Sequence, residues 1–234
     1  MCTRDIVGPE EVAMPGDDAR FDVPLLTAAE AGHHLEISAS TVADWKKREL
    51  VHSLNAETRG APTLPLAGMA EAQVLRGFRL SGLSGVEIDR VTRTLRSELG
   101  DYALIKERLA HDGASIFRDV ARQVDNPQWV RVRDGQRVLQ KVIDDHLQYL
   151  EWAEDGYPIR LRLRSYANKH AEVIIDPRFS GGKPVFERTK VRPKDVMRQF
   201  LTGEDPADIA DDYDLTVDEV YAAIRVLSGH RDAA

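Results

Sequence analysis

The N-terminal part of the chain carries apolar residues at helical spacing. One stripe recurs at intervals of three and four residues, which places its members on one face of a helix: Ile88, Val91, Leu95 and Leu99. A preceding amphipathic helix starts near Leu66 and is expected to end at Gly82. The stretch SGLSGVEI, residues 81–88, joins these two helices.

Two shorter helices are predicted before this pair. Thr27 caps the first, and Glu30 three residues later completes a capping box. Residues 37–38 form a turn, and Ser40 caps a second helix that runs through Arg48. Two short helices joined by a tight turn indicate a helix-turn-helix unit. The stretch NAETRGAPTLPL after it has the turn chemistry of a short wing.

From about residue 111 the pattern changes to that of strands. Branched and polar residues mix or alternate in three runs, 115–120, 128–134 and 159–165. Between the last two runs a helix with one apolar face is predicted over 138–150. A last short strand, EVIIDP, ends at Pro177.

Three short helices are predicted after residue 193. The first ends at Gly203, a residue type that suits the position after a helix, and the second begins with Pro206. The third carries one apolar stripe, made of Val217, Val220, Tyr221, Ile224 and Leu227.

Composition narrows the possible classes of function. The formal charge of −7 argues against a general nucleic-acid coat, but not against a local basic patch. The single cysteine, Cys2, cannot form an internal disulfide, so a reducing cytoplasm is expected. No apolar run approaches the roughly 18 residues of a membrane span, and no secretory signal is visible. Residues 1–22 combine Pro, Gly and mixed charges, which is typical of a loose leader.

Several fragments resemble enzyme motifs but lack the residues or the residue spacing that those motifs require. SGGKP has no phosphate-loop frame, and Pro184 occupies the place of the Ser or Thr. His146 follows two aspartates, but it lies on the apolar face of its predicted helix, which favours a partly buried histidine over a metal ligand. Cys2 has no visible base partner. We therefore expect no enzyme activity, no metal and no cofactor.

The block TAAEAGHHLEISASTVADWKKRELVHSL resembles the DNA-binding half of the MerR-like winged helix-turn-helix family, and SGLSGVEI matches that family's joint between the next two helices. The resemblance covers about residues 25–100. The expected wing, ETRGAP, has one cation and lacks the family's Arg-x-Tyr. Hydroxyls at a helix start can bind phosphate and cations can neutralise it. The residues expected near DNA are Ser40, Thr41, Lys46, Lys47, Arg48 and Arg59.

The stretch VIIDPRFSGGKPVFERTKVRP, followed by GEDPADIADDYDLTVDEVYAAI, is similar to the family called domain of unknown function 433. The shared pattern is an apolar strand, D-P-R, a G-x-P-V turn, a T-x-[IV] step and two helices, and it spans 172–226. This resemblance implies a β-hairpin followed by a three-helix bundle. Members of that family are often encoded beside PIN-type ribonucleases and act as antitoxins. Together with a MerR-like N-terminal domain, the chain looks like a VapB-type antitoxin.

The resemblance implies a cognate PIN-type ribonuclease toxin, whose metal is held by acidic side chains. Residues 174–193 offer cations together with three prolines, which limit the unfolded states lost on docking. Arginine is favoured because its planar fork pairs two carboxylate oxygens. The residues expected to contact the toxin are Arg178, Phe179, Lys183, Phe186, Arg188 and Arg192. The alternative is that the segment folds as a hairpin edge over its own helices, with both phenylalanines in the local core.

These patterns predict an α+β protein with an N-terminal winged helix-turn-helix, a small strand/helix middle region and a C-terminal β-hairpin plus three-helix bundle. The expected divisions are a leader (1–22), a MerR-like DNA-binding domain (23–105) and a C-terminal antitoxin domain (106–234). The last contains a strand/helix segment at 111–170 and the 433 domain at 172–228.

The expected function is that of an antitoxin in a type II toxin–antitoxin system, which neutralises its ribonuclease and represses its own operon by binding operator DNA. Residues 201–220 contain acidic residues and no Lys or Arg, so DNA is not expected to bind there. The alternative is a stand-alone MerR-like transcription regulator with a C-terminal dimerisation or sensor module. A homodimer is expected, because the apolar stripes on 138–150 and on the last helix exceed what one small domain needs.

Overall fold

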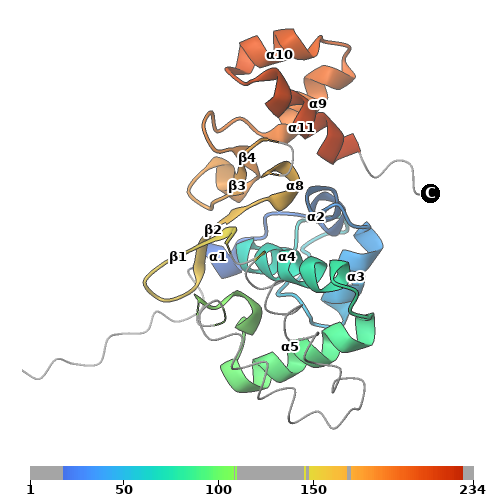
Figure 1. Cartoon of the computed structure of the whole chain (residues 1–234), viewed down its shortest axis with the longest axis vertical. Helices are drawn as coiled ribbons and strands as arrows, with labels where there is room; N and C mark the ends of the chain where they lie inside the picture. The colour runs from blue at the N-terminus through green and yellow to red at the C-terminus, as the bar shows by residue number, and fades with distance from the viewer. Residues whose placement is uncertain (1–17, 108, 110–144, 146–147, 168–169, 229–234) are drawn as a thin grey trace, which may run out of the picture.

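The computed structural model describes residues 18–107, 109, 145, 148–167 and 170–228. Helices make up most of the N-terminal half, and a second group of helices lies at the other end of the molecule (Figure 1). The N-terminal elements are α1 (Ala19–Asp22), α2 (Ala28–Leu35), α3 (Ala39–Lys47), α4 (Leu66–Leu80), α5 (Gly85–Leu99) and the short 3₁₀ helix η1 (Ala103–Ile105). Residues 18–22 fall in the range predicted as a loose leader, but here they contain α1, whose Arg20 pairs with Asp155 at 2.5 Å.

The helix-turn-helix forms as predicted, with one correction. Thr27 caps α2 and makes a full capping box with Glu30. The cap of α3, however, is Ser38 rather than Ser40, because the Ser38 side chain accepts the backbone N–H of Thr41 at 3.2 Å. Ser40 is already inside the helix, and the helix ends at Lys47 with Arg48 as its C-terminal cap. The sequence offers several hydroxyls here, and only the backbone conformation selects among them.

Helix α4 is the centre of the N-terminal half. All of its residues from Leu66 to Phe78 are buried, because α1, α2, α5, η1 and a strand pack around it. It ends shortly before Gly82, as predicted. The apolar stripe of α5 is confirmed for Ile88, Val91 and Leu95, which are buried against the core.

The predicted wing is a loop. Its base is held where Leu26 pairs with Leu64 in an isolated bridge and the N–H of Leu54 donates to the carbonyl oxygen of Thr63 at 2.8 Å. Residues 55–60 between these ties are exposed and form no strand. The base of the loop lies beside the end of α3, where Lys46 donates to the Thr63 hydroxyl.

A small antiparallel sheet follows, with strand order β1-β2-β3-β4. Its strands are β1 (Leu150–Trp152), β2 (Pro158–Arg162), β3 (Val173–Ile175) and β4 (Val185–Phe186). Strand β2 packs on α4, which joins the sheet to the N-terminal helices. The β3–β4 pairing, with Val173 opposite Phe186, is the predicted hairpin.

Two predictions for the middle region need correction. Leu150 starts β1, so the helix predicted over 138–150 does not extend that far. The strand predicted over 159–165 ends at Arg162 and gives way to the short helix α8 (Arg164–Ala167). The strands predicted at 115–120 and 128–134, and nearly all of 138–150, lie outside the described residues.

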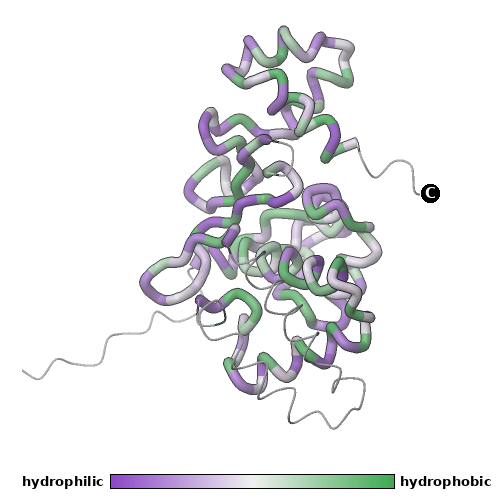
Figure 2. Tube along the Cα trace, in the orientation of Figure 1, coloured by the Kyte–Doolittle hydropathy of each residue, from purple (hydrophilic) through white to green (hydrophobic). Residues whose placement is uncertain are grey.

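The chain ends in the three-helix bundle implied by the family resemblance: α9 (Pro193–Leu201), α10 (Pro206–Tyr213) and α11 (Val217–Ser228). Each helix mixes hydrophobic and hydrophilic residues along its length (Figure 2). The predicted stripe of α11 is only partly confirmed: Val220 is buried and Ile224 and Leu227 are partly buried, but Val217 and Tyr221 are exposed. The buried face also includes Ala222, Ala223 and Val226. The reason is that α11 packs against α2 and α8 as well as against its own bundle. The predicted α+β class is confirmed. Among the described helices, none has the length and apolarity needed to cross a membrane.

A buried histidine links the two halves. The Nδ1 atom of His34, on α2, lies 3.0 Å from the hydroxyl oxygen of Tyr166 on α8, and the Ser165 hydroxyl donates to the His34 carbonyl oxygen at 2.5 Å. Burial lowers the pKa of His34 to about 4, and the nearby Glu30 opposes this only in part. At neutral pH the imidazole is therefore uncharged.

This histidine predicts a loss of stability in mild acid. An unfolded chain protonates His34 at a pKa of about 6.5, whereas the folded chain resists protonation down to about 4. The contribution of neutral His34 to the free energy of unfolding is thus fully present above about pH 6.5. It is lost as the pH falls toward 4, by up to about 1.4 kcal/mol per pH unit. Urea unfolding at pH 7.5 and 5.0 should show a steeper loss for the wild type than for His34→Asn. Equal losses in the two proteins would contradict the assignment.

Candidate functional site

The start of α3 presents hydroxyl groups at the surface. Ser38 and Ser40 are exposed, and their Oγ atoms lie 3.0 Å apart. The Thr41 hydroxyl accepts a hydrogen bond from Arg79 of α4 at 2.8 Å. Arg79 is itself exposed and was not among the predicted DNA contacts. No local motif marks it, because it reaches α3 only through the packing of α4.

The predicted basic residues of this face divide into two kinds. Lys46 donates to the Thr63 hydroxyl at the base of the wing, and burial lowers the pKa of Lys46. Arg48 pairs with Asp44 at 3.3 Å and Asp89 at 3.4 Å, and donates to a carbonyl oxygen of α5. These two side chains therefore fasten α3 to its neighbours. Lys47 and Arg59 are exposed, which leaves them as the cations best placed to reach a ligand.

Segment 174–193 is an ordered hairpin connection whose cations already interact with other groups of the same chain. Arg178 donates through Nε and Nη2 to the two oxygens of Asp176, at 2.9 and 2.7 Å. The Asp176 side chain is fully buried. Burial acts to raise the pKa of this carboxyl, but hydrogen bonds from Arg178 and Arg160 hold the pKa below its usual value. The Arg178 side chain nevertheless remains exposed.

The other arginines of the segment are paired in the same way. Arg188 donates to the Asp214 carboxylate at 2.6 Å and lies 3.6 Å from Glu219, which ties the hairpin to the α10–α11 turn. Arg192 forms two hydrogen bonds to Asp195 in the first turn of α9, at 2.7 and 3.0 Å. Both arginines are exposed, but only Asp214 among their partners is a surface carboxylate, since the side chains of Asp195 and Glu219 are largely buried. The Arg188–Asp214 pair is therefore the one that a partner could most easily replace.

The three remaining predicted contacts are less available. Phe186 is fully buried in β4, so its prediction as a toxin contact is wrong for the folded chain, and the alternative reading of a core residue holds for it. The Lys183 ammonium donates to the Leu25 carbonyl oxygen and so joins the hairpin to the N-terminal helices. Phe179 is half-buried, with the Lys190 nitrogen 4.3 Å from its ring centre.

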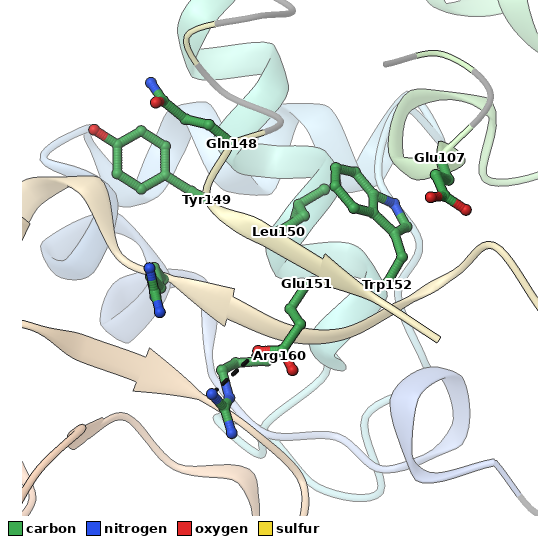
Figure 3. A pocket seen from close by; sticks show the side chains of 8 residues that line it. Glu107, Gln148, Tyr149, Leu150, Glu151, Trp152 and Arg160 are labelled. Carbon is green, nitrogen blue, oxygen red and sulfur yellow. Dashed lines mark ion pairs between the residues drawn. The ribbon is translucent and has the colours of Figure 1, made fainter. Parts of the chain in front are cut away.

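On the strand next to the hairpin, Arg160 of β2 forms ion pairs with three carboxylates. It lies 3.1 Å from Glu151, 3.2 Å from Asp176 and 3.2 Å from Glu187. Arg160 and Glu151, whose ion pair is drawn in Figure 3, line a cavity of about 400 Å³ together with Trp152. Because each acid there has an arginine partner, the arrangement neutralises charge rather than activating a group for catalysis. Within the described residues, no three His, Cys, Asp or Glu side chains group as metal ligands would.

Comparison with known proteins finds relatives along nearly the whole chain. Residues 173–225 match the family described as "Protein of unknown function (DUF433)", as the sequence predicted. The chain is 31% identical over 240 residues to a Mycobacterium tuberculosis protein named "Putative antitoxin VapB45", and the match covers 92% of this chain and 100% of that one. It is also similar to the crystal structure of Rv2018 from M. tuberculosis, with a TM-score of 0.73 and 31% identity over 88% of this chain and 99% of the other.

Proposed function

The chain belongs to the VapB45 family, with a DUF433 region at its C-terminal end, and from this premise we propose that it is the antitoxin of a type II toxin–antitoxin pair. The observation that carries the proposal is the extent of the relationship, which includes both the helix-turn-helix half and the hairpin-and-bundle half. The proposed role is not catalytic. The antitoxin binds a PIN-type ribonuclease through its C-terminal half and represses its own operon through α3 and the wing.

The distribution of surface charge supports DNA binding by the N-terminal half and toxin binding by the C-terminal half. The exposed surface of α10 and of the start of α11 carries Asp208, Asp211, Asp212, Asp214 and Asp218, so it would repel phosphate. The α3 face instead offers exposed hydroxyls, Lys47 and Arg59. The hairpin offers the half-exposed guanidiniums of Arg178 and Arg188, which suit the carboxylates of an acidic ribonuclease site.

Co-expression with the product of the adjacent gene tests the proposal, which requires that product to be a PIN-type ribonuclease. We expect a stable complex by native mass measurement, and loss of the ribonuclease's RNA cleavage in its presence. A ribonuclease that neither binds the chain nor is inhibited by it would favour the alternative, a stand-alone transcription regulator. The same mass measurement reports the oligomeric state, for which we propose a homodimer, because helix-turn-helix proteins commonly read two half-sites.

For DNA we expect a Lys47→Ala, Arg59→Ala double variant to bind the chain's own promoter about tenfold more weakly at moderate salt. Each phosphate contact contributes a slope of about −0.9 to log K against log salt. The slope should therefore become shallower by about 2 per protomer if both cations touch phosphate. A Lys194→Ala, Arg198→Ala variant removes the same charge from α9 and serves as the control. Equal losses in the two variants, measured by fluorescence anisotropy, would argue against a site on α3.

A further inference from the structure

A groove lies between α2 of the helix-turn-helix and α9 of the C-terminal bundle, beside the place where α11 packs against α2 (Figure 1). Its volume is about 760 Å³. The lining is mainly apolar and comes from distant parts of the chain, including Leu26, Pro184, Met197, Leu201 and Leu227. None of the residues assigned above to DNA binding takes part in it.

The α9 wall of this groove has the pattern of a binding face. Lys194, Met197, Arg198 and Leu201 follow one another at helical spacing on the same side of α9. Leu201 is 59% exposed, which makes it one of the most exposed large apolar side chains of the described chain. An apolar strip that its own fold leaves uncovered is characteristic of a surface used for association.

The charges at the rim favour an acidic partner. Four cations line the groove (Lys183, Arg192, Lys194 and Arg198), against two carboxylates (Glu30 and Asp195). Lys194 lies 3.4 Å from Glu30, and Arg198 lies 3.3 Å from Asp195. Both cations are largely exposed, so these pairs contribute little stability and can be exchanged for carboxylates of a partner at small cost. The exposed surface of α10 and of the start of α11 is acidic, which directs such a partner to this face.

We infer that the groove between α2 and α9 binds an amphipathic helix of the toxin, with apolar side chains against Met197 and Leu201 and carboxylates beside Lys194 and Arg198. Helices commonly bind in apolar grooves through residues spaced three and four apart. The inference rests on the proposed antitoxin function and adds a docking site that is centred on α9 and shares Lys183, Pro184 and Arg192 with segment 174–193. Because α2 forms one wall, toxin bound there also touches the DNA-binding half.

The test compares three variants by calorimetric titration with the cognate PIN-type ribonuclease. Leu201→Glu should weaken binding about tenfold or more, as expected for loss of a central apolar contact. A Lys194→Glu, Arg198→Glu variant changes only exposed side chains, so it should fold, and it should weaken binding to a similar extent. Leu80→Glu is the matched control, because Leu80 is 65% exposed on α4 outside the groove, and it should bind within about twofold of wild type.

The possible outcomes distinguish failure of the proposed antitoxin function from failure of the groove alone. A wild-type chain that does not bind the ribonuclease overturns the antitoxin function and the groove together. Wild-type binding that both groove variants retain overturns the groove alone, and the same follows if only an Arg178→Ala, Arg188→Ala variant loses binding. A second copy of this chain is the other candidate occupant, and native mass measurement of the Leu201→Glu variant without ribonuclease tests it. If the wild type is a dimer and this variant is a monomer, the groove binds a second copy and the inference is overturned.

Discussion

Replacing Arg96 with alanine is expected to lower the free energy of unfolding by about 3–5 kcal/mol, the cost of leaving a buried charge without its partner. Glu71 of α4 is completely buried, and the Nη2 atom of Arg96 on α5 lies 3.1 Å from its Oε1 atom. Burial raises the pKa of Glu71, and Arg96 is the main influence that opposes this rise. Without Arg96 the carboxylate must take up a proton or remain charged in an apolar setting, and both cost stability.

The loss should extend to the proposed DNA-binding face. Glu71 accepts the backbone N–H of His52 at 2.5 Å, and Arg96 donates to the carbonyl oxygens of Glu49 and Leu50. The pair therefore holds the chain between α3 and the wing. Once it is broken, we expect the wing to lose its fixed position and promoter binding to weaken together with stability.

Two comparisons isolate the buried pair. Arg93→Ala removes an exposed arginine from the same helix and should leave urea unfolding almost unchanged. A Glu71→Leu, Arg96→Met double variant removes both charges and should be much closer to wild type than Arg96→Ala, because no buried charge is left alone. If Arg96→Ala unfolds at the same urea concentration as Arg93→Ala, the pair has no structural role.

Local patterns were sufficient for the elements that are stabilised locally. The capping box of Thr27 and Glu30, the stripe of α5 and the proline that starts α10 each depend on residues within one turn of each other, so the sequence displays them directly. The hairpin and bundle after residue 172 followed from a family pattern, since their short strands carry little signal of their own. These features include most of the fold that the structure describes.

The functional residues were harder to predict, because their availability depends on contacts between distant segments. A basic residue in the sequence does not show its partner, and here Lys46 binds Thr63 while Arg188 binds Asp214. Phe186 could not be assigned to the core or the surface without the register of β3 and β4. The groove was not predictable at all, since α2 and α9 are about 160 residues apart and meet only in the folded chain.

The segment between α3 and the wing, which contains His52 and is called the wing hinge here, contacts α4 closely. This contact leads to a second large effect. In the third position of α4, Gly68 lies against the backbone of His52, and a β-carbon at residue 68 would overlap the His52 carbonyl oxygen. Its other near neighbour is a Leu64 methyl group at 3.2 Å. A flexible side chain could move aside, but a backbone carbonyl can do so only by shifting the hinge and its hydrogen bond to Glu71. We expect Gly68→Ala to lower the free energy of unfolding by about 3 kcal/mol, the upper end of overpacking costs.

The sign of this effect is what makes it informative. Alanine is intrinsically better than glycine inside a helix by about 1 kcal/mol, so a change judged on helix propensity alone should stabilise the protein. Gly85→Ala in the first turn of α5 provides that reference, because a β-carbon there meets nothing closer than an Arg48 nitrogen at 3.6 Å. Urea unfolding should show Gly85→Ala equal to or slightly above wild type and Gly68→Ala well below it, with promoter binding reduced only in the latter. If both variants are stabilised alike, then α4 does not pack against the wing hinge as closely as the structure shows, and the rigid support inferred for the proposed DNA-binding face is absent.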